Sequence, residues 1–433
     1  MRDTSSGRRP AGYAARLGVV LALALSACSS DAMLKDSGAS SVASTGYTAP
    51  GEAPRRVVIG KRDRSTRQQD AYASRNLDLP DTAGIRAVAG PAPEPTAAPA
   101  STPSGAARVV RVFYATSRRL DSAEVAPYFG ANRADELTRG FADVSLPPDH
   151  RLGAVERPAI WRFEVGEDAR RHIVLKSIYT AEPDYFNEIL AEHAAGADRR
   201  ALVYVHGFAT AFPEALQRTA QLKYDLAFKG PVVLFSWPSK GSHLAYPADA
   251  ANAEWSQPLL ESFLAELVAT EAISELTVIA FSMGAKATAA ALAQVGKSDG
   301  KDAFARKVQN IVLAAPDIDR DVFLRDLLPH LRGGGGRITL YASEKDRALE
   351  ISRGFHKVQR LGSLKPVPTV ARGLDTIDAT KVDTSLTGHA YYGDNRSVVA
   401  DLYYLIHEKL PPARRATLKA ANSAQGAYWA FAH

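Results

Sequence analysis

Cysteine is almost missing from this sequence, since Cys28 is the one cysteine among 433 residues. A single cysteine excludes an internal disulfide and a metal site built from several thiolates. No two histidines stand at the spacing of a His-x-x-x-His metal motif. The alternating Asp317, Asp319 and Asp321 lack the glycine and the glutamate of a calcium-binding loop. We therefore expect no metal ion and no cofactor.

A strong charge of one sign is missing as well. The formal net charge is +6, with 23% charged and 46% hydrophobic residues. Much of the positive excess lies in extended segments such as 55–67 rather than on a predicted helix face. This composition is typical of a globular protein, and it does not indicate a nucleic-acid partner.

A hydrophobic run long enough to span a membrane is also missing. The apolar run Leu17–Leu25 is too short for a stable spanning helix, and four arginines precede it. Leu25-Ser26-Ala27-Cys28 resembles a bacterial lipobox, whose cysteine is lipidated and becomes the new N-terminus after cleavage. We expect residues 1–27 to be a lipoprotein signal peptide and Cys28 to carry the lipid anchor. The alternative is a plain secretory signal with a chance cysteine. Ser29 is not an aspartate, which favours the outer membrane, facing the periplasm, as the location in the cell envelope.

The chain divides by composition into a tether and a folded domain. Residues 28–107 are rich in proline, alanine and serine and show no hydrophobic periodicity, which predicts a disordered tether. A short ordered piece at Arg56–Ile59 is the exception that the sequence suggests. We expect the folded domain over residues 108–410, and we interpret 411–433 as a peripheral C-terminal tail.

Strand-like and helix-like segments alternate through the folded domain. Two β-rich runs come first, at 108–114 and 141–146. Short apolar strands then follow at 202–205, 232–235, 276–281, 311–314 and 338–341. Helical spacing separates them at 212–228, 259–272 and 286–295, and a last helix carries Val398, Leu402, Leu405 and Ile406 on one stripe. Apolar strands between helices predict an α/β fold with a mostly parallel sheet covered on both faces.

The run Thr277–Ala285 carries the most specific signal in the chain. It predicts a strand, a sharp turn at Ser282 and then a helix of small residues, which is the layout of a nucleophile elbow. Ala280 stands where the first glycine of Gly-x-Ser-x-Gly would be, and Gly284 is in the last position. Small residues are needed there because the strand and the helix nearly touch. Ser282 is therefore the candidate nucleophile.

A serine nucleophile needs a base and an acid that orients it, and after an elbow both follow later in the chain. For the acid we favour Asp346, in the loop after the predicted strand 338–341. Asp317, Asp319 and Glu344 are the alternatives, and any of these carboxylates could simply cap a helix.

Five histidines follow Ser282, namely His330, His356, His389, His407 and His433. His389 lies in a predicted loop after the β-rich segment 376–382 and before the last helix, so we favour it as the base. The others fall in or near helices or at the end of the chain.

The oxyanion hole requires backbone N–H donors near the serine. One is expected from Met283, the residue after the nucleophile, and the other from the loop after strand 202–205. In that loop we favour Phe208, with Ala209 as the alternative, and we interpret His206 as structural because it precedes the nucleophile.

Several motifs together resemble the bacterial α/β-hydrolases of the esterase/lipase superfamily whose function is largely unassigned. The matching stretches are 112–118, 145–151, 205–208, 235–239, 281–284 and 315–319. The resemblance spans about residues 108–410 and implies an α/β-hydrolase fold with a Ser-His-Asp triad. The sequence departs from it at Phe281, where the family often has histidine.

These motifs predict a serine hydrolase that cleaves carboxylic esters through an acyl-enzyme. Its expected partner is a small-molecule or lipid-like ester, and the segment 237–255 is expected to border the acyl pocket. An amidase or peptidase acting on envelope material and a non-catalytic envelope binding module are the alternatives. The sequence does not indicate an oligomeric state.

Overall fold

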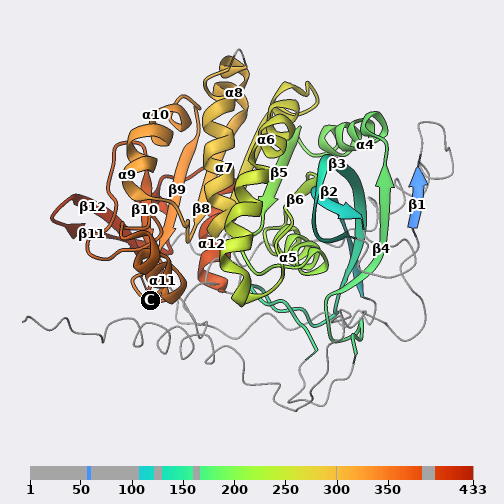
Figure 1. Cartoon of the computed structure of the whole chain (residues 1–433), viewed down its shortest axis with the longest axis horizontal. Coiled ribbons are helices and arrows are strands. Elements are labelled where there is room, and N and C mark those ends of the chain that lie inside the picture. The colour runs from blue at the N-terminus through green and yellow to red at the C-terminus, as the bar shows by residue number, and fades with distance from the viewer. Residues whose placement is uncertain are drawn as a thin grey trace, which may run out of the picture. The chain divides into compact units, whose positions relative to one another are not determined.

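The computed structural model describes residues 56–59, 107–120, 129–158, 166–298, 300–382 and 395–432. Its strands are β1 (Arg56–Ile59), β2 (Arg108–Leu120), β3 (Phe129–Leu146), β4 (Val174–Ala181), β5 (Arg200–Val205), β6 (Val232–Ser236), β7 (Glu275–Phe281), β8 (Val308–Ala314), β9 (Arg337–Ala342), β10 (Asp375–Asp378), β11 (Leu418–Ser423) and β12 (Gly426–Phe431). Within the described residues they form one sheet of twelve strands, in the order β1-β4-β3-β2-β6-β5-β7-β8-β9-β10-β12-β11. Figure 1 shows this order across the view, from β11 and β12 at one side to β1 at the other.

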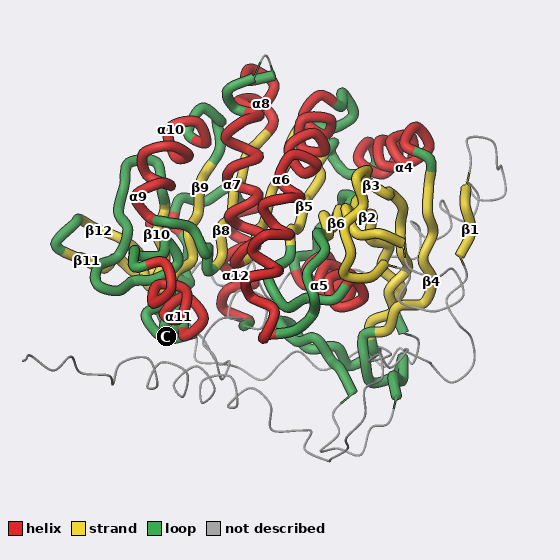
Figure 2. Tube along the Cα trace, in the orientation of Figure 1, coloured by secondary structure: helices red, strands yellow, loops and turns green. Residues whose placement is uncertain are grey.

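Helices connect the strands of this sheet. They are α4 (Pro183–Ala195), α5 (Phe212–Asp225), α6 (Tyr246–Ala269), α7 (Ser282–Val295), α8 (Lys301–Lys307), α9 (Arg320–Val322), α10 (Leu328–Leu331), α11 (Arg347–His356) and α12 (Arg396–Ile406), with the short turns η3 (His243–Ala245), η4 (Phe323–Leu327) and η5 (Pro412–Arg414). In Figure 2 the helices are red and the strands yellow, and the alternation along the chain can be followed from β5 to α7.

The strands from β2 through β6, β5, β7, β8, β9 and β10 to β12 pair in parallel. β3 pairs antiparallel with β2 and β4, and β11 pairs antiparallel with β12. The sheet is therefore mostly parallel, as the sequence predicts. The carboxyl ends of the parallel strands meet at one edge, and in such sheets that edge holds the ligand site.

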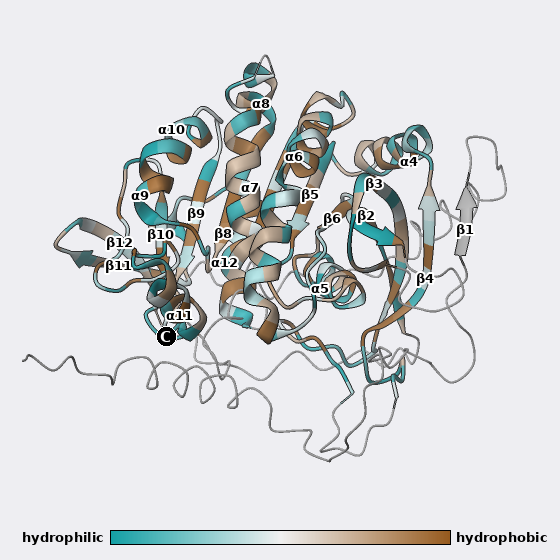
Figure 3. Ribbon diagram, in the orientation of Figure 1, coloured by the Kyte–Doolittle hydropathy of each residue, from teal (hydrophilic) through white to brown (hydrophobic). Residues whose placement is uncertain are grey.

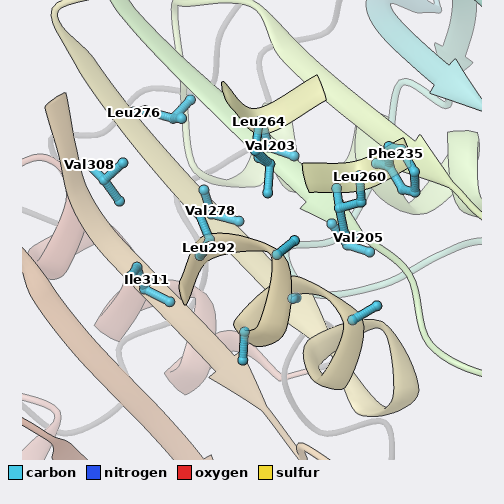
Figure 4. Packing of buried hydrophobic residues seen from close by; sticks show 14 of the residues in the cluster. Val203, Val205, Phe235, Leu260, Leu264, Leu276, Val278, Leu292, Val308 and Ile311 are labelled. Atoms are coloured by element: carbon cyan, nitrogen blue, oxygen red, sulfur yellow. The ribbon is translucent and has the colours of Figure 1, made fainter. Parts of the chain in front are cut away.

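Each face of the sheet packs against its own helices because successive residues of a strand point to opposite faces. Val203 and Val205 of β5 face a core formed with α4, α6 and α7, in which Leu260 takes part. Leu202 and Tyr204 face a second core formed with α5 and α12. Figure 4 shows Val205 beside Leu260 and Val203 beside Leu264. Figure 3 shows α7 in pale to brown colours, as its alanine-rich sequence implies. The sheet is thus covered on both faces.

The loop before α5 shows how local sequence sets a helix start near the functional edge. Pro213 stands in the first turn, where the missing N–H costs nothing. The Glu214 carboxylate accepts the backbone N–H of Ala211 at 2.9 Å. The helix begins at Phe212, as the sequence predicts, and ends at Asp225.

Two expectations from the sequence need correction. The segment 411–433 is not a peripheral tail, because its strands β11 and β12 extend the sheet beyond β10. Phe431 is buried, and its ring stacks on the ring of Tyr341 with the two centroids 6.3 Å apart. The helix expected at 259–272 begins earlier, at Tyr246, so about half of the segment 237–255 is helical.

Several expectations concern residues outside those described. Cys28, the signal peptide at 1–27 and nearly all of the tether at 28–107 lie there. Within the tether, Arg56–Ile59 is described, and it forms β1 beside β4.

Candidate active site

Ser282 lies where β7 ends and α7 begins, at the carboxyl edge of the sheet. Its backbone φ is +53°, a left-handed conformation that is strained for a residue with a side chain. Its side chain is buried together with its neighbours in the first turn of α7. A strained serine between a strand and a helix is the geometry of a nucleophile elbow.

Two glycines permit a close approach of backbones around Ser282. A Cβ on Gly284 would lie 2.1 Å from the backbone oxygen of His206, so no side chain fits there. A Cβ on Gly207 would lie 2.5 Å from Cδ1 of Phe281 and 3.1 Å from Cβ of Ser282. The loop after β5 therefore passes directly beside the serine, which brings its backbone N–H groups to the candidate site.

The backbone donors near Ser282 differ in their existing contacts. Met283 lies in the first turn of α7, where N–H groups have no acceptor within the helix. The Ala209 N–H donates to Oδ2 of Asp249 at 3.0 Å, so it is already used. Between the two candidates in the β5 loop, this contact favours Phe208 as the donor.

His206 is buried and has no role as a base in this geometry. Its ring stacks on Trp237 with centroids 5.0 Å apart, Nδ1 lies 2.8 Å from the backbone oxygen of Gly207, and Nε2 lies 3.0 Å from Oγ of Ser236. Burial, with the nearby Arg118 guanidinium, lowers the pKa of His206 to about 3. The ring is therefore neutral and locked in the loop.

Asp317 lies at the same edge, and its N–H donates to the backbone oxygen of Ser282 at 3.3 Å. Its carboxylate accepts from Nε of Arg360 at 2.6 Å, from the Ser352 hydroxyl at 2.7 Å and from the Tyr246 hydroxyl at 2.5 Å. Burial alone would raise the pKa of Asp317, but these contacts, Arg360 above all, hold it below its usual value. The carboxylate thus has three side-chain partners other than a histidine.

Asp346, the preferred acid, follows β9 and is the N-cap of α11. It is 1% exposed, and its Oδ1 accepts the N–H of Leu349 at 3.0 Å. Because β7 and β9 are parallel and separated by β8, both Ser282 and Asp346 stand at the carboxyl edge. The contacts of Asp317 with Arg360 favour Asp346 over Asp317 as the acid.

His389, the predicted base, lies outside the described residues, in the segment 383–394. The chain that leads to it leaves β10 beside the Asp346 loop. The N–H of Ala379 donates to the oxygen of Ala342 at 2.8 Å, and the N–H of Glu344 donates to Oγ1 of Thr380 at 3.0 Å. The last described residues before His389 therefore lie at the edge where the other candidates lie.

An aromatic cluster lies beside the candidate oxyanion loop. The Phe208 ring meets the rings of His243 and Tyr246 edge to face, with centroids 5.5 and 5.7 Å apart. Leu244, between them in the chain, is 74% exposed. His243, Leu244 and Tyr246 belong to the segment 237–255, which the sequence predicts to border the acyl pocket, and Phe208 belongs to the loop after β5.

The model of the family described as "alpha/beta hydrolase of unknown function (DUF900)" matches residues 182–408, which is more than half of the chain. The chain belongs to this family. The DUF900 match includes Ser282, Asp346 and His389, and the protein is an α/β hydrolase.

Solved structures with a similar fold are distant from this DUF900 chain. A predicted CIB-like hydrolase from Thermoplasma acidophilum is 14% identical, with 49% of this chain and 88% of that chain covered and a TM-score of 0.28. The carboxylesterase EstE1 from a metagenomic library is 12% identical, with 81% and 98% covered and a TM-score of 0.29. An esterase from Pyrobaculum calidifontis is 12% identical, with 80% and 93% covered and a TM-score of 0.29. No curated protein matches the chain.

In the described part of this α/β hydrolase, no group of three or more histidine, cysteine or acidic side chains is placed to hold a metal ion. None of the described helices combines the length and the apolar character needed to cross a bilayer.

Sequence reasoning missed the polar residues that hold this edge together, notably Asp249, Tyr246 and Arg360. Asp249 binds Ala209, which is 40 positions away in the chain. Tyr246 and Arg360 both bind Asp317, from 71 and 43 positions away. The one local signal was Pro247, which stands in the first turn of α6 and places Asp249 in that turn.

Proposed function

We propose that this α/β hydrolase cleaves carboxylic esters through an acyl-enzyme on Ser282. The observation that supports this most directly is the left-handed Ser282 at the junction of β7 and α7, with the Gly207–Phe208 loop against it. Such a turn holds a hydroxyl at the sheet edge next to backbone N–H donors.

In the proposed reaction His389 removes the proton from the Ser282 hydroxyl, and the oxygen attacks the ester carbonyl carbon. The N–H groups of Phe208 and Met283 stabilise the negative oxygen that forms. His389 then gives its proton to the leaving alcohol. Water, deprotonated by His389, attacks the acyl carbon and releases the acid and free Ser282.

Asp346 is proposed to orient His389 and to stabilise its charged form. The role of His389 rests on its place in the sequence and on the position of residues 379–382, which precede its segment. Because only the neutral imidazole can accept the serine proton, activity is expected to fall as the pH drops through the titration of His389.

Labelling with a fluorophosphonate, followed by mass spectrometry of the modified peptide, tests this proposal. We expect modification at Ser282 that is lost in Ser282→Ala and in His389→Ala. Ser256→Ala is the matched control, because Ser256 is equally buried and bonds to Ser117 rather than to the candidate site. Ester turnover that survives Ser282→Ala would refute the proposal.

A panel of matched esters and amides then separates the reaction classes. An esterase turns over the esters far faster, because resonance stabilises the carbonyl of an ester less than that of an amide, whereas hydrolysis of amides at comparable rates would indicate an amidase. A folded protein without labelling or turnover would indicate a binding module.

We also propose that the hydrolase is anchored to the bacterial outer membrane, facing the periplasm, through a lipid on Cys28. The support is the sequence 25–28 with the short apolar run before it. Metabolic labelling with a fatty acid should mark the wild-type protein and leave Cys28→Ser unmarked. Release of unlabelled wild-type protein in soluble form would contradict this location.

A further inference from the structure

Asp249, in the first turn of α6, is fully buried beneath the loop that follows β5. Its Oδ2 accepts the N–H of Ala209 at 3.0 Å and the hydroxyl of Ser239 at 2.6 Å. Its Oδ1 accepts the N–H of Lys240 at 2.7 Å. One carboxylate therefore connects the loop after β5, the loop after β6 and the start of α6.

Ser239 links Asp249 to Thr210, the next residue of the loop after β5. Its hydroxyl donates to Asp249 and accepts the N–H of Thr210 at 2.9 Å. Ser239 is 1% exposed, so water does not compete for these bonds. Two successive backbone N–H groups, those of Ala209 and Thr210, are thus held by Asp249, one directly and one through Ser239.

Arg118 holds the same two loops by donating hydrogen bonds to their backbone oxygens. Its guanidinium donates to the backbone oxygen of Thr210 at 2.8 Å and to that of Ser239 at 3.0 Å. Its Nε donates to Oγ of Ser236 at 2.8 Å. Arg118 is 1% exposed and supplies a positive charge that interacts with Asp249.

The consequence for the site concerns which N–H faces the substrate. Ala209 has φ +54°, a conformation that is strained for alanine and that the bond to Asp249 holds in place. Because the Ala209 N–H is bound to Asp249, the preceding N–H, that of Phe208, is the remaining candidate donor of this loop. Gly207 brings this part of the loop against Ser282, as the close approach of their atoms shows.

We propose that Asp249 is a positioning residue of the oxyanion hole, which sets the Phe208 N–H by binding Ala209 and Ser239, with Arg118 as its counter-charge. This proposal rests on the proposed esterase function. It assigns Asp249 no contact with the substrate. Its effect is expected in the stabilisation of the transition state rather than in substrate binding.

Three variants test it, in the full chain and with an ester that the wild type cleaves. Asp249→Asn keeps the shape of the side chain but replaces one acceptor oxygen with a donor. Ser239→Ala removes the link to Thr210 and one donor of Asp249, which keeps its bonds to Ala209 and Lys240. Asp225→Asn is the matched control, because Asp225 is equally buried and accepts the N–H of Gly153 at 2.7 Å, at the far end of α5.

For Asp249→Asn we expect kcat to fall about 10²-fold, the effect of a misplacement of about 1 Å or of a lost oxyanion donor, with KM within about threefold of the wild type. The affinity for a trifluoromethyl ketone, whose adduct with Ser282 carries the oxyanion, should fall by a similar factor. Ser239→Ala should lower kcat about tenfold. Asp225→Asn should lower the melting temperature and leave the kcat of the folded protein unchanged.

The outcomes separate this proposal from the one on which it rests. Folded Asp249→Asn with kcat and ketone affinity within about threefold of the wild type would overturn the positioning role, while labelling at Ser282 would leave the esterase proposal standing. If Asp249→Asn does not fold, an unchanged kcat in Ser239→Ala overturns the role instead. A wild type without Ser282-dependent turnover overturns both.

Discussion

His150 allows a quantitative test of how this fold is stabilised. Its Nδ1 lies 2.8 Å from Oε2 of Glu156, and its Nε2 lies 2.8 Å from Oδ1 of Asp225. Its side chain and that of Asp225 are fully buried. Burial alone would lower the pKa of His150, but the hydrogen bonds and charges of the two carboxylates outweigh it and raise the pKa to about 9.

The sign and size of the effect follow from this raised pKa. His150 holds its proton more tightly in the folded than in the unfolded protein, so its charged form stabilises the fold. Between the ordinary value of 6.5 and about 9, this corresponds to about 3 kcal/mol of unfolding free energy, at about 1.4 kcal/mol per pH unit. The contribution is fully present below about pH 6.5 and is lost as the pH rises through about 9.

Urea unfolding from pH 6 to pH 10 measures this contribution when the wild type is compared with His150→Gln. The wild type should lose about 3 kcal/mol more than the variant across this range, because glutamine does not titrate. His193→Gln is the control. Burial is the main cause that lowers the pKa of His193 to about 4, so its ring stays neutral across the whole pH range of the experiment. Parallel pH profiles for the wild type and His150→Gln would refute the reasoning.

Three further changes test the candidate site. Gly207→Ala should lower kcat about 10²-fold, because a Cβ placed 2.5 Å from Phe281 must displace the loop by about 1 Å; unchanged steady-state kinetics would contradict this. Asp346→Asn should lower kcat about 10⁴-fold without a change in melting temperature, since asparagine also caps α11; equal turnover would exclude Asp346 as the acid. Asp317→Asn should instead destabilise the protein by about 3 kcal/mol in urea unfolding, because Arg360 loses its buried charged partner. This assignment would be contradicted if Asp317→Asn lowered kcat as much as Asp346→Asn does while the stability stayed unchanged.

The elements that the sequence predicts well are those whose signals are local. The elbow at Ser282 could be predicted because the strand, the turn and the helix lie within nine residues. The parallel sheet followed from apolar strands alternating with helices. In both cases the pattern of neighbouring residues specifies the structure.

The errors at the C-terminus and at α6 have local causes. Gly426 has φ +125°, and the aromatic residues Tyr428, Trp429 and Phe431 after it lie in β12, so a glycine followed by a β-rich run marks the hairpin of β11 and β12. Pro258 lies inside α6, where a proline removes a helical hydrogen bond, and the helix expected at 259–272 starts directly after it. The start at Tyr246 is instead set by Pro247 in the first turn.

The polar contacts around Ser282 could not have been predicted, because each joins residues that are distant in the chain. Arg360 meets Asp317 only when the chain after α11 returns to the end of β8. Asp249 and Arg118 meet around Thr210 and Ser239 only when β2, β5 and β6 lie side by side. Their residue types alone would suggest ordinary surface charges.

The two buried ion networks lie on either side of Ser282, and this placement has a physical consequence. Buried charges are costly, and apolar residues of the same volume often stabilise a fold equally well. What a charged network adds is fixed geometry, since each hydrogen bond defines the position of its partner. Asp317 holds the backbone after β8, whose N–H meets the oxygen of Ser282, while Asp249 holds the loop that carries Phe208. A strained serine and a strained alanine at φ near +50° persist only where their surroundings determine them, and these two carboxylates meet that requirement on both sides of the serine.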